Sequence, residues 1–478
     1  MTAFRNYIAG EWVAGASVSV NRNPSNIADV IGEYAQADAG EARTAVAAAT
    51  AAFPAWAHGA IQERSNVLDR AGTEILARKD ELGRLLSREE GKTLPEGIGE
   101  AMRAGQIFKF FAGEVLRQAG EKIPSVRPGV DVEVTREPVG VVGLITPWNF
   151  PIAIPAWKLA PALAHGNTVV LKPADLVPGS AWALVDILVR AGLPPGVLNL
   201  VMGRGSVVGE VLVNHPDVNA LSFTGSVGTG RAIAAKAIAR MAKVQLEMGG
   251  KNPLVVLDDA DLATAVNAAT QGAYFSTGQR CTASSRLIVT EGIHDRFVAA
   301  MTDKLKALKV GDALAAGTDI GPVVDQGQLD QDLAYVEVGR SEGAALAFGG
   351  ERLQRGTEGY YLSPALFTGA TNAMRIAREE IFGPVACVIR AKDFDEALAL
   401  ANDTEFGLCS GIVTTSLKHA AHFKRRAEAG MVMVNLPTAG VDYHVPFGGR
   451  KGSSYGAREQ GRYAAEFFTT VKTAYTAP

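Results

Sequence analysis

The chain has 478 residues, 47% of them hydrophobic and 20% charged, which is too much apolar sequence for one small core and predicts at least two globular domains. The 47 lysines and arginines nearly balance 50 acidic residues, and no block of one charge occurs, which argues against a nucleic-acid-binding surface. Three cysteines at unrelated spacings argue against a disulfide framework or a zinc site. We therefore expect reduced thiols, no metal, no nucleic-acid partner and, since residues 1–10 lack a secretory apolar segment, a cytoplasmic location.

The first long segment, residues 37–114, is rich in alanine and has charges at helical spacing, so it predicts helices interrupted near Pro54 and Pro95. The following residues 130–136 (VDVEVTR) alternate apolar and polar side chains, which is typical of a strand with one solvated face. The apolar stretch 139–171 is not a membrane span, because four prolines interrupt it. We expect no membrane partner.

After Pro138, short apolar runs alternate with helix-compatible sequence, as in the βαβ units of a doubly wound parallel sheet. The runs of the first set are VGVVGLI, NTVVLKP, VLNLVMG, NALSFTG and NPLVVLD, and those of the second set are SRLIVT, ACVIRA, CSGIVTT and MVMVN. A helix-like segment, residues 261–274, separates the two sets. We predict two α/β domains with the active site between them, and a C-terminal strand over residues 467–474 that pairs with the strand at 130–136.

Cys281 lies in FSTGQRCTASSR, between a predicted helix and a predicted strand, among small residues that leave room for a substrate. A cysteine at such a junction can expose a thiolate that attacks carbonyl groups. The alternative for any single cysteine is an inert, buried side chain. We expect that second role for Cys387 and Cys409, which lie within apolar runs.

Two polar residues could assist such a nucleophile. Glu247, in VQLEMGGKNP, ends an apolar run beside two glycines and could act as a general base, although a solvated or capping glutamate fits the same pattern. Asn149, in the turn ITPWNFP, could donate its amide to an oxyanion or could simply form the turn.

Two glycine patterns, GRGSVVG at 203–209 and GSVGTG at 225–230, each follow an apolar run and open a helix, as phosphate-binding loops do. Neither matches G-x-G-x-x-G. Lys172 ends another strand-like run and could reach a ribose or a phosphate. Each signal is weak alone.

The combination is more specific. PWNFP, LKPAD, FTGS with a following G-x-x-x-G, LEMGGKNP, GQRC, EEIFGPV and PFGGRKGS occur in this order between Ile145 and Ser453. In this arrangement the chain resembles the aldehyde dehydrogenase superfamily over nearly its whole length. The resemblance implies two Rossmann-like domains and a small β oligomerisation arm, which we assign as residues 1–119 with 140–247 (dinucleotide binding), 248–450 (catalytic) and 120–139 with 451–478 (arm). It also implies a homodimer or a homotetramer.

The resemblance further implies roles for single residues. Cys281 would be the nucleophile, Asn149 and the Cys281 backbone N–H the oxyanion hole, and Glu247 the base that activates water for hydrolysis of a thioester. The residues expected around an NAD cofactor are Ile145, Trp148, Lys172, Asp175, Gly205, Gly209, Thr224, Gly225, Ser226, Glu380 and Phe382. Asp175 stands where many NAD-using relatives have the longer glutamate, so we expect NAD to be preferred and NADP to be an alternative.

The substrate is less determined. The runs PAWKLAP and AGVDYHVPFGGRKGSSYG look most like the semialdehyde branch, in particular α-ketoglutaric semialdehyde dehydrogenases, with succinic semialdehyde enzymes as near neighbours. Arg280 is a candidate anchor for a substrate carboxylate, or an arginine paired structurally. Trp157 and Phe447, with Tyr443 and His444, would instead suit an aromatic aldehyde. A CoA-acylating enzyme and a non-catalytic relative are the remaining alternatives; the presence of Glu247 favours hydrolysis.

Overall fold

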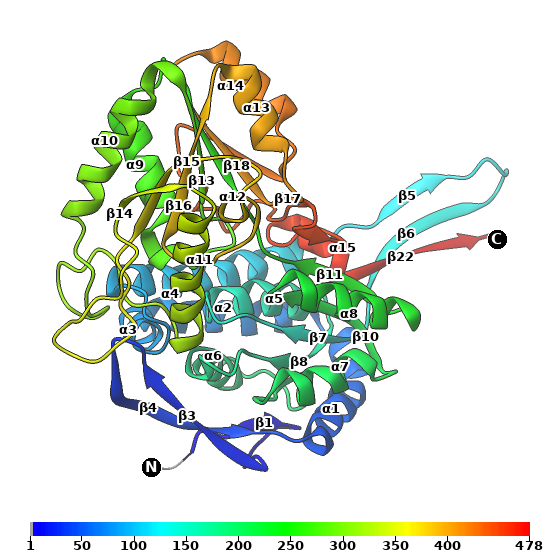
Figure 1. Cartoon of the computed structure of the whole chain (residues 1–478). Helices are drawn as coiled ribbons and strands as arrows, with labels where there is room; N and C mark the ends of the chain where they lie inside the picture. Colours follow the sequence, from blue (N-terminus) through cyan, green and yellow to red (C-terminus); the bar gives the residue numbers. More distant parts are fainter. Residues whose placement is uncertain (1–2) are drawn as a thin grey trace.

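The computed structural model describes residues 3–478, which form two lobes and a projecting β arm (Figure 1). The lower lobe in Figure 1 contains an eight-stranded sheet and the upper lobe a seven-stranded sheet. Both sheets are mainly parallel and have helices on both faces. This confirms the predicted fold class.

The eight-stranded sheet has the order β2-β1-β9-β8-β7-β10-β11-β21. Its strands are β1 (Asn6–Ile8), β2 (Glu11–Val13), β7 (Val141–Ile145), β8 (Thr168–Lys172), β9 (Leu198–Leu200), β10 (Val218–Thr224), β11 (Lys243–Glu247) and β21 (Ser454–Tyr455). The five strands from β9 to β11 are parallel, so their carboxyl ends meet at one edge. Ligands of open α/β sheets bind at that edge.

Helices cover both faces of this sheet because its central strands are apolar on both sides. One face packs against α2 (Ile61–Ala77), α4 (Leu94–Glu114), α5 (Ala153–Ala164) and α6 (Pro178–Arg190). The other packs against α1 (Ala39–Ala57), α7 (Glu210–Asn214) and α8 (Val227–Ala239). With α3 (Lys79–Glu90), these helices confirm the helical prediction for residues 37–114.

The seven-stranded sheet has the order β14-β15-β16-β13-β12-β18-β19, in which only β14 is antiparallel. Its strands are β12 (Pro253–Val256), β13 (Arg286–Thr290), β14 (Ala345–Phe348), β15 (Ala365–Ala370), β16 (Val385–Ala391), β18 (Cys409–Val413) and β19 (Met431–Val434). Its helices are α9 (Leu262–Ala273), α10 (Glu291–Ala307), α11 (Gln326–Ser341), α12 (Arg375–Arg378), α13 (Phe394–Asn402) and α14 (Leu417–Arg426). Every apolar run of both predicted sets forms a strand.

The arm consists of β5 (Glu121–Pro124), β6 (Asp131–Pro138) and β22 (Thr469–Thr476), which extend away from both lobes (Figure 1). β22 pairs with β6 along its whole length, as predicted. The predicted start of β22 at Phe467 is wrong, because Phe467 and Phe468 belong to the short helix α15 (Ala465–Phe468). Both rings are fully buried, and a strand would point one of two successive side chains away from the core.

Two antiparallel two-stranded sheets complete the fold: the hairpin of β3 (Ser17–Asn23) with β4 (Asn26–Gln36), and the long-range pair of β17 (Phe406–Gly407) with β20 (Arg450–Lys451). The predicted domain bounds stay a prediction. We propose one refinement, that residues 454–468 belong with the first lobe, since β21 pairs with β11 and Phe467 and Phe468 join its core. Within residues 3–478 no helix is both long enough and apolar enough to cross a membrane.

Candidate active site

Cys281 follows a strained turn, the 3-10 helix η3 (Phe275–Gly278), and precedes β13. Three successive residues of this turn, Ser276, Thr277 and Gly278, have positive φ angles of 51°, 55° and 68°. A Cβ on Gly278 would lie 2.3 Å from the carbonyl oxygen of Gly383, so only glycine fits there. Such a conformation persists only where the surrounding structure enforces it, and it is common at functional sites.

The backbone of Cys281 is held by the LEMGGKNP motif. The Asn252 side-chain amide donates to the Cys281 carbonyl oxygen at 2.7 Å and to that of Ala283 at 3.0 Å. A Cβ on Gly250 would come within 2.6 Å of the same Cys281 oxygen, so the close approach requires glycine. Within residues 3–478, no hydrogen bond uses the Cys281 backbone N–H. That donor is available to a ligand.

The thiol of Cys281 lies at the junction of two cavities and lines both. Burial, reinforced by the negative charges of Glu380 and Glu247, raises the pKa of this thiol to about 12. The thiol is therefore protonated at neutral pH, and it must lose its proton before it can attack a carbonyl carbon. Cys387 and Cys409 are buried in β16 and β18, which agrees with their expected inert role.

Asn149, which follows β7, is only 3% exposed and lines one of the cavities that Cys281 lines. The side-chain amide of Asn149 donates to the backbone carbonyl oxygen of Gln279 at 3.0 Å, and the backbone carbonyl oxygen of Asn149 accepts from the ammonium of Lys92. One N–H of the amide thus fixes the side chain on the nucleophile loop. The second N–H is free to stabilise an oxyanion formed next to Cys281.

Glu247 is the last residue of β11 and is 2% exposed. The Ser454 hydroxyl donates to its Oε2 at 2.5 Å, and a Cβ on Gly448 would lie 2.7 Å from its Oε1. Burial and the neighbouring carboxylate of Glu459 raise the pKa of Glu247 well above its usual range. A buried carboxyl with a raised pKa can take a proton from water at neutral or mildly alkaline pH.

Beside Glu247 lies a buried ion pair between Lys158 of α5 and Glu459. The Lys158 ammonium also donates to the Ser222 hydroxyl at 2.7 Å, and Ser222 in turn donates to Gln245 at 2.8 Å. Sequence patterns did not single out either member of the ion pair. The available signal was a lysine within a helix whose other residues are apolar, because such a lysine is buried only with a partner.

The first cavity, about 210 Å³ in volume, lies at the carboxyl edge of the eight-stranded sheet. Six of the residues expected around a dinucleotide line it together with Cys281 and Asn149: Trp148, Thr224, Gly225, Ser226, Glu380 and Phe382. Trp148 and Phe382 meet edge to face with ring centroids 5.3 Å apart. Phe382 has a φ of 66°, and the Glu380 carboxylate accepts from the backbone N–H of Gly250 at 3.0 Å.

The other five predicted residues lie farther along the same sheet edge. Ile145 ends β7, and Gly209 ends the one-turn π-helix η2 (Gly205–Gly209). The two residues are neighbours, since a Cβ added to Gly209 would lie 4.0 Å from the Ile145 side chain. Lys172 ends β8, and its ammonium donates to the carbonyl of Pro173 at 2.8 Å and to Asp175 at 3.4 Å. Burial lowers the pKa of Lys172 and raises that of Asp175.

This edge fits a dinucleotide. The Thr224 hydroxyl is buried and has no partner within residues 3–478, so it is free for a ligand. Helix α8 begins at the same edge, with Ser226 as its N-cap. The space beside Gly228 and beside Gly205 is open, since a Cβ added to either glycine would meet no atom within 4 Å. A helix N-terminus with open space in front of it binds phosphate groups.

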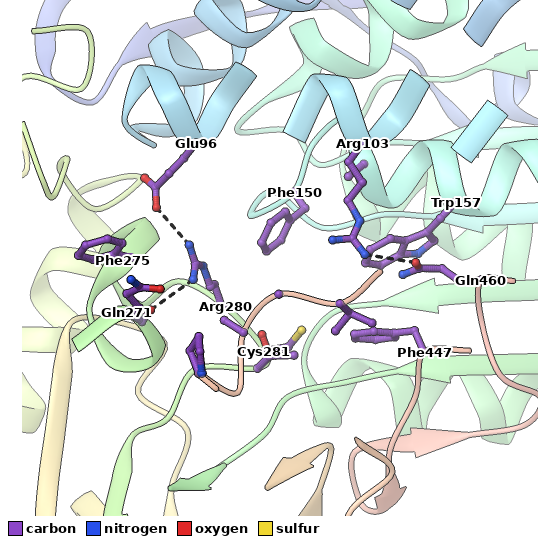
Figure 2. A pocket seen from close by; sticks show the side chains of 16 residues that line it. Glu96, Arg103, Phe150, Trp157, Gln271, Phe275, Arg280, Cys281, Phe447 and Gln460 are labelled. Carbon is purple, nitrogen blue, oxygen red and sulfur yellow. Dashed lines mark hydrogen bonds and ion pairs between the residues drawn. The ribbon is translucent and has the colours of Figure 1, made fainter. Parts of the chain in front are cut away.

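The second cavity, about 340 Å³ in volume, is also lined by Cys281 (Figure 2). Trp157 and Phe447 form part of its wall with ring centroids 5.3 Å apart, and Phe150 adds a third ring. Arg280 also lines this cavity, but its guanidinium donates to Glu96 at 3.1 Å and to the Ser276 hydroxyl at 2.7 Å. These contacts match the alternative of a structurally paired arginine.

Sequence patterns missed several residues that line the two cavities: Glu96, Arg103, Gln271, Phe275 and Gln460 in the larger, and Gln328 and Gln331 in the smaller. Except for Phe275, which opens the quoted segment FSTGQRCTASSR, none belongs to one of the quoted motifs, and helix α4 supplies Glu96 and Arg103. Among residues 3–478 no group of three histidine, cysteine or acidic side chains could hold a metal ion.

Comparison with known proteins gives the family. The model of the aldehyde dehydrogenase family matches residues 12–474. The chain belongs to the aldehyde dehydrogenase family. It is 45% identical to an alpha-ketoglutaric semialdehyde dehydrogenase of Bacillus subtilis, over 99% of this chain and 98% of that protein. A betaine aldehyde dehydrogenase of Cereibacter sphaeroides is 42% identical over 90% of this chain and 88% of that protein.

Solved structures of aldehyde dehydrogenases agree with the fold. A betaine aldehyde dehydrogenase from Staphylococcus aureus, crystallised in complex with NAD+, superposes with a TM-score of 0.97 at 35% identity, over 99% of this chain and 95% of that one. An NAD-dependent aldehyde dehydrogenase from Sinorhizobium meliloti gives the same TM-score at 37% identity, over 100% and 95% of the two chains. The chain is therefore an oxidoreductase of the aldehyde dehydrogenase type.

Proposed function

We propose that the protein oxidises α-ketoglutaric semialdehyde to 2-oxoglutarate with NAD, through a thioester on Cys281. The observation that carries this proposal is the place of Cys281, which lines both a dinucleotide-type cavity and an aromatic-walled cavity suited to an aldehyde. Two relatives support the choice of substrate. Besides the Bacillus subtilis enzyme, a 2,5-dioxopentanoate dehydrogenase of Saccharolobus solfataricus is 41% identical to this chain.

In the first half-reaction the Cys281 sulfur bonds to the aldehyde carbon, and the carbonyl oxygen becomes an oxyanion. The free amide N–H of Asn149 and the backbone N–H of Cys281 stabilise that charge, since both donors are already oriented. Thr224, Gly225, Ser226 and Glu380 would hold NAD, which would accept the hydride that leaves the former aldehyde carbon as the oxyanion collapses to the thioester. The raised pKa keeps the thiol protonated at neutral pH, so its proton passes to solvent before the attack.

In the second half-reaction the thioester on Cys281 is hydrolysed. Glu247 removes a proton from the attacking water, the Cys281 sulfur leaves, and the carboxylic acid is released. The Lys158 ammonium favours the ionised form of Glu247, because its charge lowers the pKa of that carboxyl, and so helps Glu247 to act as a base. A Glu247→Gln variant should keep the first half-reaction and lose the second.

For the cofactor we propose NAD over NADP. The Asp175 carboxylate beside Lys172 would accept a hydrogen bond from a ribose hydroxyl and would repel a 2′-phosphate. The exposed Arg204, whose charge lowers the pKa of Asp175, weakens this repulsion, so we expect some use of NADP. The proposal predicts a higher kcat/KM with NAD in steady-state kinetics, and a higher value with NADP would overturn it.

An aromatic aldehyde is the second candidate, because Phe150, Trp157 and Phe447 line the substrate cavity. The deciding measurement is kcat/KM for α-ketoglutaric semialdehyde, succinic semialdehyde and benzaldehyde with the purified enzyme. We expect the five-carbon semialdehyde to be oxidised most efficiently. A preference for benzaldehyde of more than about tenfold would overturn the semialdehyde proposal.

We also propose that the protein is a homodimer or homotetramer joined through the arm. Seven of the eight residues of β22 and all four of β5 are exposed, and both are edge strands of their sheet, which favours pairing with another strand. Light scattering of the intact protein tests this proposal, and a monomer at micromolar concentration would overturn it.

A further inference from the structure

Four side chains on the wall of the substrate cavity carry N–H groups that have no acceptor within residues 3–478. They are Nε of Arg103, Nε of Arg280, Nε1 of Trp157 and Nε2 of Gln460. Figure 2 shows Arg103, Trp157 and Gln460 gathered on one side of the cavity, away from Arg280 and Glu96. Buried donors in folded proteins are nearly always paired, so a cluster of unpaired donors indicates a ligand that brings several acceptors.

Arg103 also carries a charge that no partner neutralises. Within residues 3–478 no carboxylate lies within 4.0 Å of its guanidinium, and its single hydrogen bond runs to Oε1 of Gln460 at 3.4 Å. Glu100, one turn earlier on α4, is committed to Lys92 at 2.8 Å. Burial lowers the pKa of Arg103, while Asp442 and Glu100 oppose that effect from a longer range.

The two arginines of the cavity therefore differ in kind. Both terminal nitrogens of Arg280 are engaged, one with Glu96 and the Ser276 hydroxyl and the other with the carbonyl oxygen of Gln271 on α9, so that only its Nε is unpaired within residues 3–478. Arg103 presents its charge to the cavity. Only the second arrangement leaves a guanidinium free to bind a substrate anion.

The backbone at Gln460 is strained in a way that supports this assignment. Gln460 has a φ of 59°, which is unfavourable for a residue with a side chain, and it is completely buried. The preceding Glu459 exchanges two backbone hydrogen bonds with Phe447, at 2.7 and 2.9 Å. This bridge fixes the strained backbone beside the cavity wall, as is typical of positions where geometry serves binding.

We infer that Arg103 anchors the carboxylate of an aldehyde substrate while the aldehyde end reaches Cys281, and that the amide of Gln460 and the indole N–H of Trp157 bind the remaining oxygens. This inference rests on the proposed function and names the groups that select its substrate class. A carboxylate and a 2-oxo group supply the acceptors that the three donors lack. The same guanidinium repels cationic aldehydes such as betaine aldehyde, the substrate named for several of the relatives.

The test uses three five-carbon aldehydes with NAD. They are α-ketoglutaric semialdehyde (2,5-dioxopentanoate), 5-oxopentanoate, which lacks the 2-oxo group, and pentanal, which also lacks the carboxylate. We expect Arg103→Met to lower kcat/KM for both anionic aldehydes by about 100-fold, mainly through KM, and to change that for pentanal by less than about threefold. Arg103→Lys should recover part of the loss. An equal loss for all three aldehydes, or no loss for the anions, would overturn the inference.

Arg280→Met is the matched control. It removes an arginine from the same cavity, and we expect the ratio of kcat/KM for 5-oxopentanoate to that for pentanal to stay at the unsubstituted value. A collapse of this ratio in Arg280→Met, but not in Arg103→Met, would make Arg280 the anchor and overturn the inference. If Arg103→Met does not fold, as judged by its melting temperature, Arg103→Gln replaces it.

The unsubstituted enzyme separates this inference from the proposed function. If it prefers pentanal to 5-oxopentanoate, the semialdehyde proposal fails, and the inference fails with it. If it prefers the anionic aldehydes and the Arg103 variants keep that preference, the proposed function stands and the inference alone is overturned.

Discussion

The side-chain amide of Asn252 holds the carbonyl oxygen of Cys281 at 2.7 Å, and its Oδ1 accepts from the backbone N–H of Cys409 at 2.9 Å. Asn252, which belongs to the same LEMGGKNP motif as Glu247, thus ties the nucleophile loop to β18. The motif positions the nucleophile as well as supplying the proposed base, Glu247.

We expect Asn252→Ala to lower kcat by about 100-fold, because the Cys281 loop loses its fixed orientation. The variant leaves the Cys281 and Ala283 carbonyls and the Cys409 N–H without a partner, so the free energy of unfolding should fall by about 1–3 kcal/mol per unpaired group. Steady-state kinetics and urea unfolding measure the two effects. An unchanged kcat in a destabilised variant would show that Asn252 only supports the fold.

The thiol of Cys281 should react slowly with iodoacetamide in the cofactor-free enzyme at neutral pH. Its pKa is raised to about 12, and only the thiolate reacts, so the rate should keep rising with pH up to about pH 10 without a plateau. An ordinary cysteine would level off above its pKa of about 8.5. Peptide mapping of the alkylated enzyme, with Cys281→Ala as control, measures this rate, and a plateau near pH 8 would contradict the account.

Lys158→Met should destabilise the protein and shift its pH profile. The substitution leaves Glu459 buried without its cation, which costs about 3–5 kcal/mol of stability, and it removes the charge of Lys158 that lowers the pKa of Glu247, so that pKa rises further. A base with a higher pKa is ionised only at higher pH, so the rising limb of kcat should move to higher pH. Lys158→Met combined with Glu459→Gln should regain most of the stability. If neither the pH profile nor the unfolding midpoint of Lys158→Met moves, the ion pair has no such role.

Gly249→Ala should weaken cofactor binding. A Cβ at this position would lie 2.0 Å from Oε2 of Glu380, which would displace the carboxylate from its cavity. We expect KM for NAD to rise by about tenfold or more, with little change in KM for the aldehyde. Gly99→Ala on α4 is the control, since a Cβ there meets nothing within 4 Å. Equal KM values for NAD in both variants would argue against a cofactor role for Glu380.

Much of the fold could be predicted because the central strands are buried on both faces and read as unbroken runs of Val, Ile and Leu, such as TVVLK of β8. The short edge strands could not. β1 and β21 have three and two residues, and their pairing depends on contacts with distant parts of the chain. The predicted start of β22 is wrong because a local sequence pattern alone does not distinguish a strand from one helical turn at Phe467 and Phe468.

The motif residues of the site were predictable for a similar reason, since Cys281, Glu247, Asn149 and Glu380 stand in local patterns with glycine or proline neighbours. Arg103 and Gln460 do not stand in such a local pattern. Their importance depends on which groups remain unpaired after folding, and pairing is decided by residues far apart in the sequence, as the hydrogen bond between Arg103 and Gln460 illustrates. Substrate selection was therefore the part that sequence patterns could not supply.

The most direct test of the central claim is to trap the acyl-enzyme. Glu247→Gln, mixed rapidly with NAD and α-ketoglutaric semialdehyde and quenched in acid, should release about one equivalent of NADH and carry the acyl group on the peptide that contains Cys281, as found by mass spectrometry. Cys281→Ser under the same conditions should form neither product at a comparable rate. Full NAD-dependent activity of Cys281→Ser, or an acyl group on Cys387 or Cys409, would contradict the account.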